Sequence, residues 1–437
     1  MIRLIRGFKD ILPGEVEVWQ QVERTARSLF ENFGFREIRI PIMEHTELFA
    51  RSIGEETDIV EKEMYTFPDR NGQMLTLRPE ATASVARAYV EHRFYASEPM
   101  QKLYTIGPMF RRERPQKGRY RQFYQINAEV FGIAQPMIDA QIILMLMNLM
   151  VRLGLSDVSI HVNSLGCPQC RPVFTSSLSR FLAGTEDSLC ANCLRRRDTN
   201  PLRVLDCKVP ECRQAMETAP STLHSLCGEC RLHFEWVVGA LDQFRVSYTV
   251  DPRLVRGLDY YTRTTFEVLT GSLGAQNAIA GGGRYDGLVK ALGGPDTPGI
   301  GFAVGLDRLV EIVDSIAAMD VQPSCVFLAV LGDEARDRAF RWLCEFNLKG
   351  IRAEMEFGAR SLKSQMRHAH RIGARCVVIL GSDELEKGTA TVRDMLTKHQ
   401  EEVPLESVGE YVCRAVSHGL EAQRAQEHAS GESRTRC

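Results

Sequence analysis

The stretch that decides the fold runs from Tyr104 to Phe131 and reads YTIGPMF-RRERPQKGRYR-QFYQINAEVF. Its two ends, Tyr104–Phe110 and Gln122–Phe131, have the composition of strands. The loop between them, Arg111–Arg121, holds six cations in eleven residues. We therefore predict two neighbouring strands joined by a strongly basic loop.

The second of these strands carries polar residues where a buried strand would be apolar. Alternate positions share one face of a strand, and that face holds Phe123, Gln125, Asn127 and Glu129. We expect it to line a cavity. The guanidinium group of an arginine can bind two phosphate oxygens at once, so we expect the arginines of the adjoining loop to bind phosphate. The alternative is that the loop is a charged hairpin tip exposed to solvent.

The periodicity of the rest of the chain predicts one sheet domain and one smaller domain. Helices are expected at 14–33, 81–90, 137–153 and 306–316, and strands at 35–42, 74–77, 158–162, 246–250, 264–270 and 276–280. After a linker at 320–323, strands and helices alternate, which is typical of a small α/β domain. We predict a catalytic domain at 1–320, an α/β domain at 324–420 and a disordered polar tail at 421–437.

Composition excludes several classes of protein. The 437 residues carry 54 Lys and Arg against 56 Asp and Glu, and 54 − 56 gives a net charge of −2. A generally basic nucleic-acid coat protein is excluded, whereas a local basic groove is not. No apolar run reaches the ~18 residues of a membrane helix, and the start MIRLIRGFKD lacks the apolar centre of a secretory signal. We expect a cytoplasmic protein with reduced thiols.

Eight of the 13 cysteines lie between Cys167 and Cys230, in a segment, 167–235, that interrupts the sheet domain as an insertion. They form four pairs, three of them C-x-x-C, and two such pairs complete a tetrahedral site. The sequence predicts structural zinc; inert or redox-active thiols and an iron–sulfur cluster remain alternatives, and the spacing leaves open which pairs share a metal. The candidate ligands are Cys167, Cys170, Cys190, Cys193, Cys207, Cys212, Cys227 and Cys230.

Three further segments concentrate glycine with charged and aromatic residues. They are RGLDYYTR (Arg256–Arg263), AGGGRYDG (Ala280–Gly287) and GIGFAVGLDR (Gly299–Arg308). Glycine lets a backbone approach a ligand closely, and we expect Arg284 and Tyr285 beside that ligand; tight turns without a ligand are the alternative. Neither glycine run opens the first helix of a β-α-β unit, and no P-loop is present. An ATP site would therefore use arginines on an antiparallel sheet.

Taken together these segments resemble the class II aminoacyl-tRNA synthetases, and specifically the histidyl-tRNA synthetase family. The first helix through Gly54, Phe110–Glu129 and Gly299–Arg308 resemble the three class II motifs, and Arg256–Tyr261 and Gly281–Tyr285 resemble the two histidyl signatures. The resemblance implies an α+β fold, in which helices flank an antiparallel sheet that carries the Cys-rich insertion, followed by an anticodon-binding α/β domain. It also implies a homodimer formed through the first motif.

The resemblance further implies an enzyme that activates L-histidine with ATP and Mg²⁺ and transfers it to tRNA. Arg256 and Arg111 would be catalytic. Histidine would be bound by Glu80, Ala81, Thr82, Arg111, Gln125, Glu129, Arg256, Tyr260, Tyr261 and Tyr285. ATP would be bound by Arg111, Glu113, Arg119, Arg121 and Arg308.

Two basic segments are expected to contact tRNA phosphates. One is Arg195–Arg197 in the insertion, and the other is the helix at 359–371 with Arg360, Lys363 and Arg367. Two other functions compete with this interpretation. The first is a catalytically silent paralogue that senses histidine, and the second is a zinc and RNA-binding module, which would leave most of the chain without a task.

Overall fold

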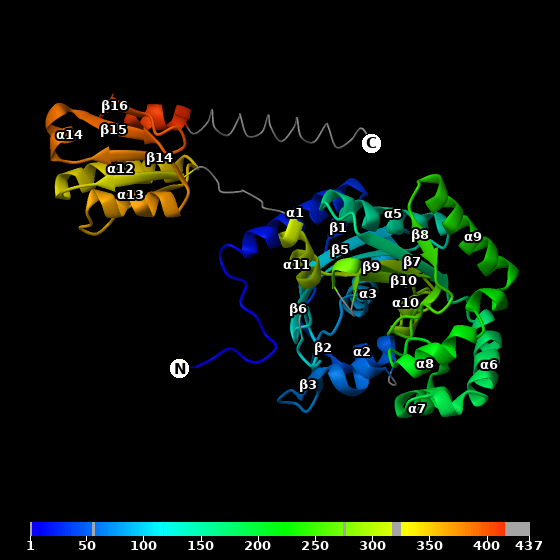
Figure 1. Ribbon diagram of the computed structural model, residues 1–437. Coiled ribbons are helices and arrows are strands. Elements are labelled where there is room, and N and C mark those ends of the chain that lie inside the picture. The colour runs from blue at the N-terminus through cyan, green and yellow to red at the C-terminus, as the bar shows by residue number, and fades with distance from the viewer. Residues whose placement is uncertain (1, 55–56, 117, 274–276, 317–324, 416–437) are drawn as a thin grey trace. The chain divides into compact units, whose positions relative to one another are not determined.

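The computed structural model describes residues 2–54, 57–116, 118–273, 277–316 and 325–415, and these form two compact units, 1–318 and 319–437 (Figure 1). The linker predicted at 320–323 and the tail predicted at 421–437 lie outside the described residues. No helix among those described is both long and apolar enough to cross a membrane.

An eight-stranded sheet forms the centre of the first unit, in the order β1-β5-β6-β11-β10-β9-β7-β8. Its inner strands pair antiparallel, and only the two edge pairs, β1 with β5 and β7 with β8, are parallel. The strands are β1 (Arg36–Glu37), β5 (Gln101–Phe110), β6 (Gln122–Phe131), β7 (Val158–Ser164), β8 (Tyr248–Val250), β9 (Thr262–Thr270), β10 (Ala278–Arg284) and β11 (Gly299–Gly305).

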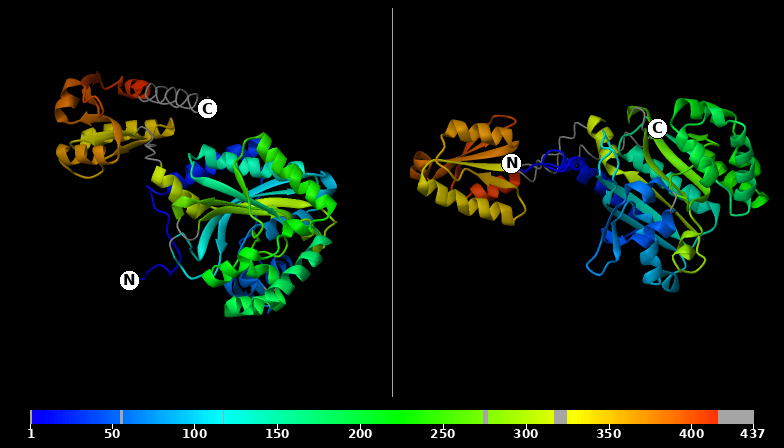
Figure 2. Two further views of the ribbon diagram at one scale, coloured as in Figure 1. Left: turned by 45° about the vertical axis from the view of Figure 1, so that its right-hand side comes forward. Right: turned by 90° about the horizontal axis from the view of Figure 1, so that it is seen from below.

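Helices cover one face of this sheet and bury the largest apolar core. They are α1 (Val16–Asn32), α5 (Pro136–Arg152), α9 (Gly228–Gln243) and α11 (Leu306–Ile316), and Figures 1 and 2 show them along the same side. Ile126, Val130 and Phe302 point into this core. Because strand side chains alternate, the neighbouring residues of β6 and β11 face the opposite side, where the candidate site lies.

The opposite face carries a small sheet and short helices. The three-stranded sheet has the order β2-β4-β3. The elements are β2 (Met43–His45), α2 (Thr46–Ile53), η1 (Ile59–Glu63), β3 (Tyr65–Pro68), β4 (Met74–Leu77), α3 (Thr82–Glu91), α4 (Phe94–Ser97) and α10 (Leu288–Ala291), whereas η6 (Gly271–Leu273) follows β9 and contacts Asp157.

The strand predicted at 35–42 is wrong from Ile38 onward, because only Arg36–Glu37 is a strand. The last backbone bond to β5 is from the Ile38 N–H to the Tyr104 oxygen at 2.8 Å, and a buried arginine binds the carbonyl groups further along. The guanidinium of Arg78 donates to the carbonyl oxygens of Ile40 at 2.8 Å and Pro41 at 3.2 Å, so these groups are not available to a sheet neighbour.

The Cys-rich insertion leaves the sheet after β7 and returns through α9. It consists of short helices at one end of the sheet (Figure 2). They are α6 (Cys170–Ala183), η2 (Glu186–Ser188), α7 (Ala191–Thr199), η3 (Pro201–Val204), α8 (Pro210–Ala215), η4 (Met216–Thr218) and η5 (Thr222–Ser225).

The second unit is an α/β domain with a five-stranded sheet in the order β13-β12-β14-β15-β16. α12 packs on one face and α13 on the other, which confirms the predicted alternation. The elements are β12 (Cys325–Val330), α12 (Asp333–Leu348), β13 (Ala353–Met355), α13 (Leu362–Arg371), β14 (Ala374–Leu380), α14 (Ser382–Lys387), β15 (Thr389–Asp394) and β16 (Gln400–Pro404). The α+β fold class predicted from the sequence is confirmed.

Candidate active site

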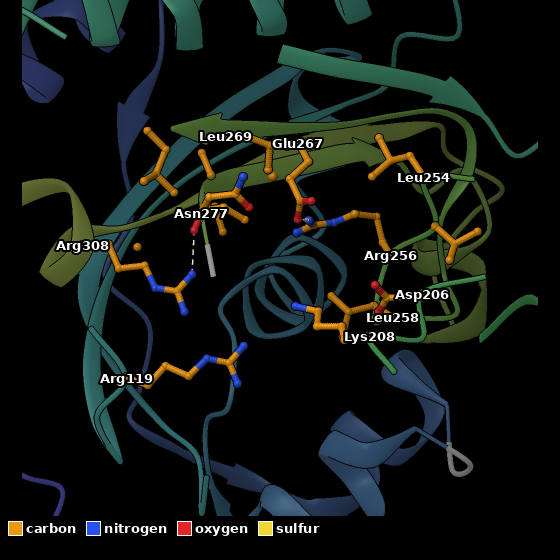
Figure 3. Close-up of a pocket in the computed structure, with 18 of the residues that line it drawn as sticks. Arg119, Asp206, Lys208, Leu254, Arg256, Leu258, Glu267, Leu269, Asn277 and Arg308 are labelled. Atoms are coloured by element: carbon orange, nitrogen blue, oxygen red, sulfur yellow. Dashed lines mark hydrogen bonds and ion pairs between the residues drawn. The ribbon is translucent and has the colours of Figure 1, made fainter. Parts of the chain in front are cut away.

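A cavity of about 780 Å³ opens on the face of the large sheet that no long helix covers. Arg111, Arg256 and Arg308, which are far apart in the sequence, all line it. Figure 3 shows Arg119 and Arg308 projecting from one side, and Arg256 and Lys208 from the other. Cations outnumber carboxylates around this space, so it suits a polyanionic ligand.

Glycines in the central strands make room for the site's own side chains. Gly281 of β10 pairs with Glu267 of β9, and a Cβ atom there would collide with the guanidinium of Arg256. Gly301 of β11 pairs with Glu129 of β6, and a Cβ atom there would collide with the Glu129 carboxylate. Gly281–Gly283 and Gly299–Gly305 therefore lie within strands, and the alternative of a tight turn is wrong for them, whereas Gly287 does lie in a turn.

Arg111, Arg256 and Arg308 are each held by a specific partner. Arg256 pairs with Glu267 (Figure 3). Burial lowers the pKa of Arg256, but Glu267, Tyr260 and Tyr261 together outweigh that effect, so the pKa is raised overall. Arg308 donates from Nη1 to the Ala278 oxygen at 2.6 Å, and Arg111 donates from Nε to the Pro79 oxygen at 2.9 Å. Such fixed cations need little reorganisation when an anion arrives.

Beside the cavity lies a buried cluster around Glu129. Its Oε1 accepts a hydrogen bond from Thr82 Oγ1 at 2.6 Å, and its Oε2 accepts one from the Tyr285 hydroxyl. Burial raises the pKa of Glu129 to about 8, although these two hydrogen bonds oppose the shift. The rings of Tyr260 and Tyr261 complete the cluster; Tyr260 lies 5.7 Å from the Tyr285 ring and 4.7 Å from the Tyr261 ring.

Glu80, which directly precedes the N-cap residue of α3, closes the cluster. Its two carboxylate oxygens accept the backbone N–H groups of Thr82 and Ala83, each at 2.8 Å, and so satisfy the start of that helix. Burial raises the pKa of Glu80 against the effect of these bonds and of the charge of Arg111. Arg111 thus acts electrostatically on this cluster and also lines the cavity.

The structure therefore divides the predicted residues into two adjoining groups. The cavity is lined by Arg111, Glu113, Arg119, Gln125, Arg256 and Arg308. The buried cluster contains Glu80, Ala81, Thr82, Glu129, Tyr260, Tyr261 and Tyr285. Gln125 and Glu129 lie on the same face of β6, which joins the two groups.

Two arginines lie elsewhere. Arg121 is absent from the cavity lining; it donates from Nη1 to the Arg6 oxygen at 3.3 Å and anchors the N-terminal segment. Arg284, expected beside a ligand, is fully buried on the core side and pairs with Asp139, which also contacts His233 Nε2 at 2.8 Å. The expectation for Arg284 is wrong because consecutive residues of a strand point to opposite faces.

Sequence reasoning missed several charged residues that line the cavity, among them Asp206, Lys208 and Glu267. Glu267 had a usable signal, because it is an acidic residue in the otherwise apolar and hydroxyl-bearing stretch 264–270. Asp206 and Lys208 flank Cys207, and only the folded insertion brings them to this wall.

The eight cysteines of the insertion form two groups of four. Within each group the sulfur atoms lie within 4.8 Å of one another, and each group could bind a metal ion. One group is Cys167, Cys170, Cys227 and Cys230, and the other is Cys190, Cys193, Cys207 and Cys212. The first pair along the chain therefore meets the last, and the second meets the third.

Comparison with known proteins agrees with this geometry. Residues 7–309 match the family described as histidyl-tRNA synthetase, and residues 325–414 match the anticodon binding domain. A histidine--tRNA ligase of Desulfatibacillum aliphaticivorans is 61% identical over 96% of this chain and 100% of its own length, and one from Geobacter sulfurreducens is 54% identical over 93% of this chain and 98% of its own. The structure of apo histidyl-tRNA synthetase from S. aureus superposes with a TM-score of 0.79 at 35% identity, covering 94% of this chain and 99% of that one. The chain belongs to the histidyl-tRNA synthetase family.

Proposed function

We propose that this chain ligates histidine to the 3′ end of its tRNA in two steps. The histidine carboxylate attacks the α-phosphorus of ATP, forming histidyl-adenylate as pyrophosphate leaves. A hydroxyl of the terminal ribose of the tRNA then attacks the adenylate carbonyl, and AMP leaves. The observation that carries the proposal is that Arg111, Arg256 and Arg308 line one cavity.

In this proposal the arginines hold ATP and neutralise charge that develops at phosphorus. Arg111 and Arg256 act at the α-phosphate, which makes them the catalytic residues, and Arg308 acts at the γ-phosphate with Arg119 and Glu113 nearby. No protein nucleophile is required, because in-line positioning and charge stabilisation can supply the rate. Arg121 is left out, because it does not line the cavity and its Nη1 and Nε atoms donate to the carbonyl oxygens of Arg6 and Glu113.

The buried cluster is the proposed histidine pocket. Glu129, oriented by Tyr285, accepts the imidazole N–H and thereby selects its tautomer. The buried Oε1 of Gln125 has no hydrogen-bond partner among the described residues, and such an orphaned acceptor suits the substrate ammonium group. Glu80 and Thr82 are the other acceptors for this group. The remaining wall of the pocket consists of Ala81, Tyr260 and Tyr261.

Mg²⁺ enters with ATP as part of the substrate, zinc is the proposed metal of the insertion, and the cytoplasm is the proposed location.

The homodimer is supported by apolar side chains that are exposed on the surface of the small sheet. Met43, Phe67 and Met74 are 49%, 40% and 47% exposed there, and such a patch is typical of an interface.

Two surfaces are proposed for tRNA. On α13 and before it, Arg360, Lys363 and Arg367 are exposed. In the insertion, Arg195 lies 3.7 Å from Glu61, and Arg196 contacts Asp58. This surface would therefore have to exchange these two ion pairs for phosphate contacts.

Histidine-dependent exchange of pyrophosphate into ATP tests the function. Wild-type protein should exchange, and Arg256→Ala should lower the rate by about 10²–10³-fold, the effect of removing one oriented donor from a charged transition state. Arg256→Lys should recover part of the rate, because it retains the charge and loses the fork. The matched control is Arg152→Ala on the far side of α5, which should exchange as wild type does.

The same experiment separates the competing functions. Histidine binding without exchange by the wild-type protein would overturn the ligase in favour of the sensing paralogue. Absence of both binding and exchange would favour the RNA-binding module.

A further inference from the structure

The two cysteine groups have the geometry of tetrahedral metal sites. Four thiolates ~2.3 Å from one zinc ion lie about 3.8 Å apart. The Sγ atoms of Cys167 and Cys170 are 3.7 Å apart, and those of Cys190 and Cys207 are 3.9 Å apart. A disulfide would need ~2.05 Å, so four sulfur atoms converge in each group without covalent bonds.

Backbone groups support a thiolate in each group. The Cys227 N–H donates to Cys170 Sγ at 3.1 Å, and the Cys190 N–H donates to Cys212 Sγ at 3.0 Å. Hydrogen bonds of this kind orient metal ligands and stabilise their charge. Four thiols without a metal would gain little from such convergence, because the S–H group is a weak donor.

The insertion has little else to hold it together around the first group. The apolar cluster there consists of Cys170, Leu226 and Cys230, with partly buried cysteines beside it. The second group lies in a larger apolar cluster, but the helices α7 and α8 that carry Cys193 and Cys212 have only nine and six residues, which is too short for independent stability. A bound metal commonly supplies the missing folding free energy in such small elements.

Both groups are connected to the segment that carries Arg256. Arg171, next to Cys170, donates from Nη2 to the Tyr261 oxygen. Arg203, between Cys193 and Cys207, donates from Nη1 to the Arg256 oxygen at 3.1 Å. The second group, Cys190, Cys193, Cys207 and Cys212, also reaches the cavity itself, because Cys207 lies in the wall of the cavity.

We propose that each chain binds two zinc ions, one in the outer group Cys167, Cys170, Cys227 and Cys230 and one in the inner group Cys190, Cys193, Cys207 and Cys212, and that the two sites brace residues 256–261 through Arg171 and Arg203. Arg171 and Arg203 are then positioning residues. The metal content stands on the geometry alone, whereas the bracing of residues 256–261 rests on the proposed function.

Metal analysis of the full-length protein tests the two sites. The wild type should contain two zinc ions per chain, Cys193→Ser and Cys230→Ser one each, and the double variant none. After Cys193→Ser, alkylation should reach Cys190, Cys207 and Cys212 while the outer cysteines stay protected. One ion per wild-type chain, iron in place of zinc, or a folded and active chain without metal would overturn the proposal, as would alkylation of Cys167 in the Cys193→Ser variant.

Cobalt substitution of the wild type gives the same answer if a cysteine variant fails to fold. Two cobalt ions per chain with the intense visible bands of tetrahedral thiolate coordination are expected. Uptake of a single ion, or bands of octahedral type, would overturn the two sites.

The bracing role is tested at Arg203. Arg203→Ala should lower kcat for pyrophosphate exchange roughly tenfold, the loss expected when an oriented catalytic group is released from one hydrogen bond, with two zinc ions retained. Arg203→Lys should recover part of kcat, and Arg180→Ala, an exposed arginine of α6, should match the wild type. Wild-type kcat in Arg203→Ala would overturn the bracing, whereas a wild-type protein with two zinc ions and no exchange would overturn the proposed function instead.

Discussion

At the scale of single residues, Glu129 combines two properties that rarely coincide. It is a carboxyl group 1% exposed to solvent, and two hydroxyl groups donate to it. Its pKa of about 8 means that the protonated acid and the carboxylate interconvert near neutral pH in the protein without substrate. The imidazole N–H group of a histidine substrate, as a hydrogen-bond donor, would favour the carboxylate form of Glu129.

This raised pKa predicts how stability depends on pH. Between the ordinary pKa of 4.5 and about 8, the folded chain holds a proton that the unfolded chain releases. The contribution of Glu129 is therefore fully present below the lower value and is lost as pH rises through the upper one. In Glu129→Gln, which cannot titrate, the fall in unfolding free energy over this range should be shallower by up to about 1.4 kcal/mol per pH unit. Urea denaturation at a series of pH values measures both slopes, and equal slopes would contradict the assignment.

The sequence was informative about residues whose chemistry is local to a motif. Arg256 and Gly281 could be singled out because their motifs are specific, and the structure places the Arg256 side chain directly over Gly281. Arg121 and Arg284 lie in equally charged segments, yet their side chains point away from the cavity. Side-chain direction depends on strand register and on neighbours that the sequence does not reveal.

At the scale of elements, the glycines of β11 have unequal tasks. A Cβ atom at Gly301 would overlap the Glu129 carboxylate and the Ala128 carbonyl, whereas one at Gly305 would meet its nearest atom at an ordinary 3.7 Å. We expect Gly301→Ala to lower the unfolding free energy by about 1–3 kcal/mol, as overpacking of a filled interior does, and to weaken histidine binding. Gly305→Ala on the same strand is the control for stability. Thermal unfolding and calorimetric titration with histidine measure the two effects, and wild-type values in Gly301→Ala would contradict this account of the strand.

The helix α13 predicts a separable contribution to tRNA binding. Lys363→Glu combined with Arg367→Glu should raise KM for tRNA roughly tenfold, because two phosphate contacts become repulsive. Exchange of pyrophosphate should remain unchanged. Lys349→Glu, an exposed cation beyond α12, is the control. Aminoacylation kinetics at two salt concentrations measure the effect, and an unchanged KM would remove this helix from the tRNA surface.

Strands and long helices with regular periodicity were predicted well, and short elements were not. The predicted ranges at 74–77, 122–131 and 306–316 coincide with β4, β6 and α11. The sequence did not predict α2, η1 and α14, because five to eight residues carry too little periodic signal to tell a helix from a loop. These elements are fixed by packing rather than by local pattern.

At the scale of the whole molecule, the small sheet predicts how two copies associate. Phe67→Glu combined with Met74→Glu places two charges in the exposed apolar patch of β3 and β4, and we expect monomers. Light scattering coupled to gel filtration measures the mass, and Tyr95→Glu, an aromatic exposed elsewhere, is the control. A dimer of unchanged stability in the double variant would place the interface on another surface.

The nesting of the cysteine groups has a consequence for synthesis. All four cysteines of the inner group are present in the nascent chain once the ribosome has translated Cys212, whereas the outer group still lacks Cys227 and Cys230. The inner group also closes a shorter loop of chain than the outer group, and closing a shorter loop costs less conformational entropy. The nascent chain can therefore assemble from the middle of the insertion outward, and the ordered inner segment is already in place when α9 emerges to complete the outer group.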